Sequence, residues 1–457
     1  MMDLSEVAIA TKGHAHHGNP VVSGVSTDTR TIARNELFIA LRGEHFDGHR
    51  FVEAATARGA GAAVVDRLWA DEHALALPHV VVDDTRLALG DLAAHWREKF
   101  PSSLIGITGS NGKTTVKEMM AAILRAQALA EGLDPTLAVL ATEGNLNNDI
   151  GVPLTLLKLG PKQRAAVVEM GMNHLGEIAY LTRLARPTVA VITNAQRAHL
   201  EGVGSVSAVA QEKGAIYASL GPGGVAVVNA DDPFSGYWRG LNAGRQVLSF
   251  GLDRPAEVTA RYTLKGLTSA LHIKTPQGSV DVVLQAPGLH NVRNALAATA
   301  SVLGAGASLS AVAEGLHAYA GVKGRLQVRP AKERATLIDD TYNANPDSVR
   351  AAIDVLAFNP GRKILVLGDM GEIGEQAAQF HDEVGGYAKS EGVDLLFALG
   401  QHSELAARNF DGGGRHFASV EELIPALLAE LAAGTTVLVK GSRFMRMERV
   451  ADAISER

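Results

Sequence analysis

The sequence predicts an α/β protein of three domains: a small N-terminal α/β domain, a central P-loop domain with a parallel sheet, and a doubly wound C-terminal domain. Three observations lead to this prediction. The 457 residues are too many for one hydrophobic core. Short apolar runs that end in polar loops alternate with helical patterns, which is typical of parallel sheets. One of these runs leads into a glycine-rich loop that ends in Lys-Thr-Thr.

The composition is that of an ordinary globular protein, with 46% apolar and 20% charged residues. The formal net charge of −6 argues against a nucleic-acid-binding protein, because such proteins are usually basic. The chain has no cysteine, which excludes disulfides, thiolate metal sites and a cysteine nucleophile. Its first residues lack the pattern of a signal peptide, and no run approaches the roughly 18 apolar residues of a membrane span. We therefore expect a cytoplasmic protein, and we expect a monomer.

The N-terminal domain is predicted to span residues 1–98. Apolar runs predict its strands and amphipathic runs its helices: strands at 36–41, 62–66 and 80–83, and helices at 51–57 and 87–96. Two polar segments, 26–30 and 42–49, contain hydroxyls, arginines and glycines. They could hold a nucleotide or a phosphate, and plain turns explain them at least as well.

The central domain, predicted for residues 99–322, opens with a strand, a glycine loop and a helix over 103–120. The loop is Gly109-Ser-Asn-Gly-Lys-Thr-Thr115, and Ile107 stands where the general Walker form has glycine. Backbone N–H groups and a helix N-terminus at such a loop bind phosphate. Lys113 adds a positive charge, and the Thr114 hydroxyl can bind Mg²⁺. The sequence therefore predicts a nucleoside triphosphate site.

Further apolar runs of the central domain predict strands at 165–168, 188–192 and 224–228. Glu169 directly follows the first of them, and His199 follows the second. Because ligands of open α/β sheets bind outside the carboxyl ends of the strands, the P-loop, Glu169 and His199 should share one edge. Glu169 offers the oxygen that Mg²⁺ prefers, whereas His199 would need a second metal ion to explain it. A solvated glutamate and a structural histidine are the alternatives.

The helix after Ser205 carries a lysine on its apolar face. Lys213 lies four residues after Val209 and three before Ile216. Burial there would lower the pKa of the ammonium and favour the neutral amine, which is the form that reacts with carbon dioxide. Alternatively, the side chain extends along the helix and its charged end reaches water.

Two polar segments of the central domain suit ligands. Loop 144–153 is bounded by glycines and suits a bound peptide or sugar. Its polar side chains are Asn145, Asn147, Asn148 and Asp149. Segment 288–298 opens a helix, with Asn291 and Asn294 on neighbouring faces of the first turn. These two amides could read an adenine edge, and helix capping alone is the alternative.

The C-terminal domain is predicted to span residues 323–457. Its strands are expected at 336–339, 363–367, 395–399 and 436–439, between helices. This alternation again predicts a doubly wound sheet. Arg325 lies at the junction with the central domain, where its charge could reach across a cleft. Asp340 and Tyr342 belong to the polar loop after the first of these strands.

Taken together, these segments resemble the Mur ligases, the ATP-dependent amide-forming enzymes of peptidoglycan precursor synthesis. The resemblance covers essentially the whole chain and is carried by segments 144–153, 169–174, 198–205 and 340–346. These segments are most similar to the branch that joins D-alanyl-D-alanine to a UDP-N-acetylmuramoyl-tripeptide. Val203 stands where an aromatic residue is usual, and Gln196-Arg197 replaces small residues.

The resemblance implies a UDP-binding N-terminal domain, an ATP-binding central domain and a Rossmann-like lid. It assigns the ATP phosphates to Lys113 and its loop, which comprises Gly109, Ser110, Asn111, Gly112, Lys113, Thr114 and Thr115. It assigns Asn291 and Asn294 to the adenine region. From the lid, Arg325, Asp340 and Tyr342 are placed around the nucleotide.

The resemblance also implies two magnesium ions. Thr114 and Glu169 would hold the first ion, and His199 the second, with a carbamate on Lys213 as its anionic ligand. Lys113, Lys213, His199 and Arg325 are thereby the expected catalytic residues. The UDP-sugar region corresponds to Ser26, Thr27 and Arg30.

The implied reaction runs through an acyl phosphate, formed by attack of the tripeptide carboxylate on the γ-phosphate of ATP. The amine of D-alanyl-D-alanine would then displace phosphate, and domain closure would assemble the site. Three alternatives remain from the sequence: a diaminopimelate- or lysine-adding relative, a folylpolyglutamate synthase, and a regulatory P-loop ATPase.

Overall fold

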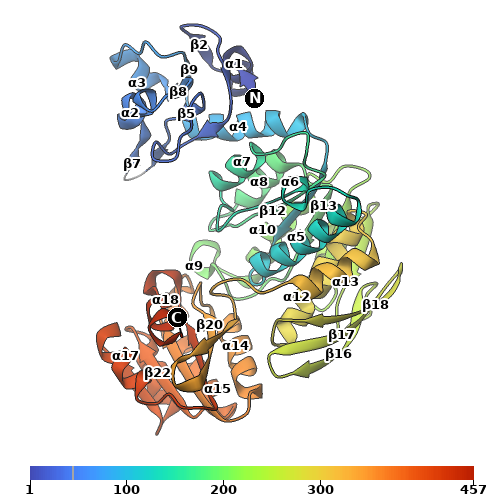
Figure 1. Ribbon diagram of the computed structural model, residues 1–457, viewed down its shortest axis with the longest axis vertical. Coiled ribbons are helices and arrows are strands. Elements are labelled where there is room, and N and C mark those ends of the chain that lie inside the picture. The colour runs from blue at the N-terminus through green and yellow to red at the C-terminus, as the bar shows by residue number, and fades with distance from the viewer. Residues whose placement is uncertain (44–45, 457) are drawn as a thin grey trace.

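The computed structural model describes residues 1–43 and 46–456. Its chain forms three α/β domains that follow one another along the long axis of the molecule (Figure 1). The three-domain α/β architecture predicted from the sequence is therefore confirmed, while the boundaries at 98/99 and 322/323 stay predictions. Residues 44 and 45 of the polar segment 42–49 lie outside the described residues. No helix within the described ranges is long and apolar enough to cross a membrane.

The N-terminal domain contains a five-stranded sheet. The strands, in spatial order, are β2 (His14–His16), β9 (His79–Val82), β8 (Ala62–Asp66), β5 (Leu37–Ile39) and β4 (Val25–Ser26). All neighbouring pairs are parallel except β2 with β9. Short pairs lie beside the sheet: β1 (Met2–Asp3) with β3 (Val21–Val22), and β6 (Arg42–Gly43) with β7 (Phe46–Asp47). Its helices are α1 (Leu4–Thr11), α2 (Val52–Ala57), α3 (Arg67–Glu72) and α4 (Thr85–Glu98).

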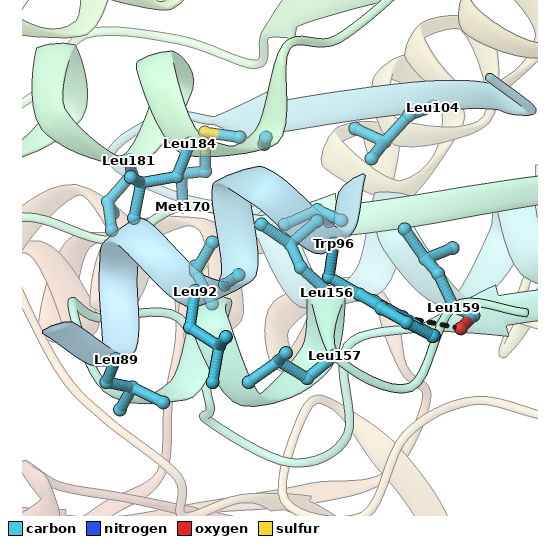
Figure 2. Close-up of a cluster of buried hydrophobic side chains, with 14 of the residues drawn as sticks. Leu89, Leu92, Trp96, Leu104, Leu156, Leu157, Leu159, Met170, Leu181 and Leu184 are labelled. Carbon is cyan, nitrogen blue, oxygen red and sulfur yellow. Dashed lines mark hydrogen bonds between the residues drawn. The ribbon is translucent and has the colours of Figure 1, made fainter. Parts of the chain in front are cut away.

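Helix α4 joins the N-terminal domain to the central domain through an apolar contact (Figure 2). Leu92 and Trp96 of α4 belong to one continuous core with Leu156 and Leu184 of the central domain. The Trp96 indole N–H also donates to the carbonyl of Leu159 at 2.8 Å. Burying one such side chain stabilises the fold by about 1.5–3 kcal/mol. These two domains are therefore held together by a shared core.

The central sheet is wholly parallel and places the predicted loops at one edge. Its strands, in spatial order, are β11 (Val139–Ala141), β12 (Ala165–Glu169), β10 (Ser103–Thr108), β13 (Val189–Ile192), β14 (Val225–Asn229) and β15 (Gln246–Phe250). In register, Ile107 of β10 lies beside Glu169 of β12, and Thr108 beside Ile192 of β13. The strand ends before the P-loop, Glu169 and the segment that carries His199 are therefore neighbours.

Helices cover both faces of this sheet. On one face, α5 (Lys113–Ala130) and α12 (Leu289–Gly304) share a core with Ile105 and Ile107. On the other face, α7 (Gly151–Leu156), α8 (Glu177–Ala185) and α10 (Val206–Gly214) share a core with Ala166 and Val168. The sheet region also contains the short helices α6 (Pro135–Ala138), α9 (Leu200–Val203) and α11 (Ser235–Leu241).

The central domain contains elements that were not predicted: the edge strands β11 and β15 and a second sheet. Strands β16 (Thr259–Lys265), β17 (Thr268–Thr275) and β18 (Gly278–Leu284) form a separate antiparallel sheet. It packs its apolar side chains, such as Leu271 and Ile273, into the core that also includes α12 and α13 (Leu309–Ala318).

The C-terminal domain has its own sheet and its own cores. The strands, in spatial order, are β19 (Gln327–Ala331), β20 (Ala335–Asp340), β24 (Thr435–Lys440), β21 (Arg362–Gly368), β22 (Leu395–Leu399) and β23 (Gly414–Phe417). Only β19 is antiparallel to its neighbour. The helices are α14 (Pro346–Phe358), α15 (Ala377–Ser390), α16 (Ser403–Phe410), α17 (Val420–Leu428) and α18 (Glu448–Ile454). All four strands predicted here are confirmed, each within one or two residues at its ends.

Candidate active site

A large cleft opens where the central domain faces the C-terminal domain, with a volume of about 1190 Å³. Most of the residues predicted to bind ATP or substrate line it. From the central domain these are Ser110, Asn111, Gly112, Lys113, Thr115, Asn145, Asn147, Asn148, Asp149, Glu169, His199, Asn291 and Asn294, and from the C-terminal side Arg325, Asp340 and Tyr342. The single cleft therefore joins three strand ends of the central sheet to the first loop of the C-terminal domain.

The P-loop, residues 109–115, has the backbone that only glycine permits at two positions. Gly109 has a φ of +150°, and a Cβ added there would stand 1.7 Å from the Thr193 hydroxyl oxygen. Gly112 has a φ of +83°, and its added Cβ would stand 2.5 Å from Asn294 Oδ1. Helix α5 begins immediately afterwards, so its free N–H groups and positive dipole end face the loop. The local structure is thus a phosphate cradle.

Lys113 is held across this cradle. Its Nζ donates to the carbonyl oxygens of Gly109 at 2.7 Å and Ser110 at 3.3 Å. Burial lowers the pKa of the ammonium, an effect that the carboxylate of Glu169 opposes. The lysine is therefore positioned where a bound phosphate would meet it.

Thr114 and Glu169 form the oxygen pair predicted to bind a metal ion. The Thr114 hydroxyl donates to Glu169 Oε2 at 3.0 Å. Asn147 Nδ2 donates to the other carboxylate oxygen at 2.8 Å, and the Glu169 backbone N–H donates to Thr142 Oγ1 at 2.9 Å. Glu169 is only 1% exposed. Both of its oxygens are fixed, and its neighbour Thr114 adds a third hard oxygen of the kind Mg²⁺ prefers.

His199 stands at the start of α9 in a left-handed conformation, with a φ of +58°. Burial lowers the pKa of its imidazole. Its Nδ1 lies 3.1 Å from Glu372 Oε2 of the C-terminal domain, within ion-pair distance, but the approach is not aligned for a hydrogen bond. Glu372 was not predicted. It also has a left-handed backbone, with a φ of +60°, and such strain in a non-glycine residue is often found at functional sites.

Lys213 is completely buried in α10. Burial lowers the pKa of its ammonium well below the ordinary value, and the nearby charge of Lys113 lowers it further. The side chain therefore does not extend to water as the alternative interpretation required. It lies behind the cleft and is not among the residues that line it.

The first turn of α12 carries three polar side chains toward the cleft. Asn291 donates to the carbonyl of Pro287 at 2.8 Å and accepts from Asn294 Nδ2 at 3.0 Å. His290 was not predicted as a site residue. Its Nε2 is buried without a hydrogen-bond partner, and burial lowers the pKa of the ring to about 4.

Arg325 reaches from the C-terminal side onto the P-loop. Its Nη2 donates to the Thr114 hydroxyl oxygen at 2.8 Å, and its guanidinium lies 4.0 Å from the centroid of the Tyr342 ring. Asp340 accepts from Lys440 Nζ at 2.5 Å and from the backbone N–H of Leu326 at 3.1 Å. Lys440 is buried and was not predicted as a site residue, because a single lysine at a strand end carries no distinguishing pattern.

The residues predicted to bind substrate fall into two groups. Asp149 of loop 144–153 pairs with Arg86 of α4, and Asn148 Oδ1 accepts from the backbone N–H of Gly151, the first residue of α7, at 2.9 Å. The second group does not reach the cleft. Ser26, Thr27 and Arg30 lie in the N-terminal domain, where the Arg30 guanidinium binds Asp28 and lowers the pKa of that carboxyl to about 2.

Comparison with known proteins finds Mur ligase domains along most of the chain. The Mur ligase middle domain matches residues 107–302, the glutamate ligase domain of Mur ligases matches 324–443, and the Mur ligase family catalytic domain matches 21–97. The UDP-N-acetylmuramoyl-tripeptide–D-alanyl-D-alanine ligase of Escherichia coli K12 is 42% identical over 99% of this chain and 98% of its own length. The chain belongs to the Mur ligase family.

Other Mur ligases support this placement. The enzyme of the same name from Bacillus subtilis is 34% identical over 99% of this chain and 98% of its own length. A crystal structure of MurF from Acinetobacter baumannii is 36% identical, covers 99% of this chain and 98% of its own, and has a TM-score of 0.89. A MurF ligase from Thermotoga maritima, solved in complex with ADP, is 26% identical over 94% and 97% of the two chains, with a TM-score of 0.81.

Proposed function

We propose that this chain is an ATP-dependent ligase that joins D-alanyl-D-alanine to the terminal carboxylate of a UDP-N-acetylmuramoyl-tripeptide. The observation that carries the proposal is the chain of contacts from Arg325 to Thr114 to Glu169 beside Lys113. These contacts place two positive charges, those of Arg325 and Lys113, beside the oxygens of Thr114 and Glu169 at the phosphate cradle. Arg325 comes from the C-terminal side and the others from the central domain. The names of the relatives that match nearly the full chain support the choice of substrates.

The reaction needs ATP because a carboxylate oxygen is a poor leaving group. One carboxylate oxygen of the tripeptide would bond to the γ-phosphorus, and the bond from that phosphorus to the bridging oxygen of ADP would break. The amine nitrogen of the dipeptide would then attack the carbonyl carbon of the acyl phosphate. Inorganic phosphate would leave with the carboxylate oxygen, and the nitrogen would lose its proton.

The residues at the cleft would stabilise the negative charge in these steps. Lys113 and the N–H groups at the start of α5 face the phosphates, and Arg325 approaches them from the opposite side. Such preorganised donors supply much of the rate enhancement in phosphoryl transfer. Asn291 and Asn294 at the start of α12, with Asp340 and Tyr342, are proposed to contact the rest of the nucleotide.

Two magnesium ions fit this donor set. Thr114 and Glu169 would hold one ion and His199 the other, and the ions would neutralise the charge of the triphosphate. In the described parts of the chain no group of three or more histidine and carboxylate side chains could hold an ion by itself. That is consistent with Mg²⁺, which usually takes most of its ligands from phosphate and water.

A carbamate on Lys213 is proposed to support the second ion. Burial and the nearby charge of Lys113 lower the pKa of this amine well below its ordinary value. This favours the neutral form, which can add to carbon dioxide. The carbamate would turn this amine into an anion that the positive charge of Lys113 attracts.

The remaining assignments complete the proposal. Loop 144–153 would contact the tripeptide, and Ser26, Thr27 and Arg30 would contact the UDP end. The proposed domains are 1–98 for the UDP substrate, 99–322 for ATP and 323–457 for the lid. Cytoplasmic location and a monomeric state stay predictions.

The test measures ATP hydrolysis and product mass together. The protein is incubated with ATP, Mg²⁺, a UDP-muramoyl-tripeptide carrying either lysine or diaminopimelate, and D-alanyl-D-alanine. We expect ADP to form at a substantial rate only when tripeptide and dipeptide are both present, and the product mass to be their sum less one water. ATP hydrolysis that needs neither substrate would favour the regulatory ATPase instead.

A further inference from the structure

The C-terminal domain touches the P-loop face of the central domain through polar contacts centred on Arg197. This residue follows β13 in the central domain. Its Nη2 and Nε donate to Asp347 Oδ1 at 2.6 and 3.1 Å, and its backbone N–H donates to Asp347 Oδ2 at 2.9 Å. Asp347 lies in the first turn of α14, in the C-terminal domain. The pair therefore bridges two domains with both a side chain and a backbone contact.

The surroundings strengthen this pair. The side chains of Arg197 and Asp347 are only 26% and 23% exposed, so solvent and salt screen them less than a surface pair. Glu383 lies 3.5 Å from Arg197 Nη1, and the guanidinium stands 5.1 Å from the centroid of the Phe380 ring. Both of these partners come from α15 of the C-terminal domain. All of these contacts connect Arg197 of the central domain to the C-terminal domain.

An amide network links Arg197 to the P-loop itself. Asn111 of the P-loop and Asn345, the N-cap of α14, exchange side-chain hydrogen bonds of 2.8 and 3.4 Å across the domain boundary. Asn111 Nδ2 also donates to Gln196 Oε1 at 2.7 Å. Gln196 and Arg197 are two of the three residues that depart from the expected family pattern, and both take part in this contact.

The contrast with the other domain boundary is informative. The N-terminal and central domains share one apolar core (Figure 2), whereas the C-terminal domain has separate cores, with Leu200 and Leu267 of the central domain packed only at the edge of one. A few directional contacts can therefore decide how the C-terminal domain sits on the P-loop.

We propose that Arg197 and Asp347 are positioning residues that latch the C-terminal domain onto the P-loop and so set Arg325 against Thr114. The latch consists of the chain's own atoms, so it operates before any substrate is turned over. The effect of the latch on catalysis rests on the proposed function, because only a ligase that uses ATP needs Arg325 at the phosphates. Its effect on the distance between the two domains is independent of that function.

The structural test measures the distance between the two domains. Because the chain has no cysteine, Lys162→Cys and Glu421→Cys, both at exposed positions, allow specific attachment of a fluorescent donor and acceptor. We expect one main population of donor–acceptor distances in the otherwise unchanged chain, and a broader population shifted to longer distances in Arg197→Ala and in the near-isosteric Asp347→Asn. Added salt should lengthen the distance in the parent protein and have little further effect in the variants.

The matched control is Arg350→Ala. This variant also removes one arginine charge, here from α14. Arg350 packs on Tyr387 inside the C-terminal domain, so its loss should leave the distances between the domains unchanged. Circular dichroism melting checks that each variant folds, and Arg197→Lys, which keeps the charge but not the two-pronged geometry, should give an intermediate shift. Unchanged distance distributions in folded Arg197→Ala and Asp347→Asn would overturn the proposal.

A kinetic measurement separates the latch from the proposed function. We expect Arg197→Ala to raise the KM for ATP roughly tenfold, the scale of one lost charge-assisted pair, with the KM for the UDP-peptide nearly unchanged. If the distances shift but the protein makes no amide, the latch stands and the proposed function fails. If the distances stay and ligation proceeds, the latch fails alone.

Discussion

Arg325 Nη2 lies 2.8 Å from the Thr114 hydroxyl oxygen, although the two residues are 211 positions apart in the chain. The same hydroxyl donates a hydrogen bond to Glu169 Oε2 at 3.0 Å. A threonine hydroxyl has one proton to donate and lone pairs to accept, so Thr114 satisfies both neighbours at once. The C-terminal domain is thereby connected to the pair of oxygens predicted to bind a metal ion.

Removing Arg325 should slow the chemistry far more than it weakens binding of the UDP-peptide. We expect Arg325→Ala to reduce kcat by roughly 10²–10³-fold, as when a preorganised donor at the transition state is lost. The KM for the UDP-peptide should change little. Arg443→Ala is the matched control, because Arg443 faces the same Tyr342 ring at 5.7 Å but is largely exposed. Equal losses in kcat and in UDP-peptide binding would indicate a binding role only.

Replacing Lys213 should abolish activity in a way that small carboxylic acids partly reverse. Lys213→Ala removes the proposed carbamate, and formate or acetate could then enter the space and supply an anionic oxygen. Initial rates measured with increasing formate should rise from a very low level. Lys158→Ala, at an exposed ion pair with Glu143, should keep its activity and ignore formate. A fully active Lys213→Ala would end the carbamate hypothesis.

Lys117 should control the affinity for magnesium without touching the ion. This buried lysine of α5 donates to the carbonyl of Thr142 at 2.6 Å, and the Thr142 hydroxyl oxygen receives the backbone N–H of Glu169. Lys117→Met removes the hydrogen bond that fixes Thr142, and Thr142 in turn fixes the backbone of Glu169. The Mg²⁺ concentration for half-maximal rate should therefore rise several-fold. Mn²⁺ binding, followed by electron paramagnetic resonance, should weaken. Lys158→Met is the surface control. An unchanged metal affinity would show that Lys117 serves stability alone.

His290 should make the protein less stable in mild acid. Burial lowers the pKa of its ring to about 4, whereas an unfolded chain has an ordinary histidine pKa of about 6.5. Between these values the unfolded state binds more protons, so stability is fully present above about pH 6.5 and is lost as the pH falls toward 4. The loss from this one group is at most about 3 kcal/mol.

Urea unfolding at several pH values tests this expectation. The free energy of unfolding should fall less steeply between pH 6.5 and 4.5 in His290→Asn than in the parent protein. His272→Asn is the control, because His272 is half exposed in the antiparallel sheet. Parallel curves for the parent and His290→Asn would contradict the assignment.

The sequence predicted those features that depend on local pattern. The inner strands of the two six-stranded sheets were predicted because both of their faces are buried, which gives continuous apolar runs such as Val189–Ile192. The strands β11, β15, β19 and β23 at the edges of these sheets were not predicted. The antiparallel sheet was missed because strands such as β16 expose most of their side chains and carry few apolar residues. Alternation of polar and apolar residues is a weaker signal than a continuous apolar run.

The candidate site shows the same division. Lys113, Glu169 and His199 could be predicted to share one edge because each follows a strand end, and the parallel register brings those ends to one cleft. The contacts of Arg197 with Asp347 and of His199 with Glu372 depend on how two domains dock. No spacing within the sequence encodes that docking. The position of Ser26, Thr27 and Arg30 relative to the cleft likewise depends on how the N-terminal domain is oriented. In this structure they lie away from the cleft.

The central claim is that the cleft activates a carboxylate as an acyl phosphate before the amide forms. The most direct measurement uses a UDP-muramoyl-tripeptide labelled with ¹⁸O in its terminal carboxylate, together with ATP, Mg²⁺ and D-alanyl-D-alanine. Mass spectrometry should find one ¹⁸O atom in each inorganic phosphate released, and one retained in the new amide. Amide product with unlabelled phosphate would contradict the account.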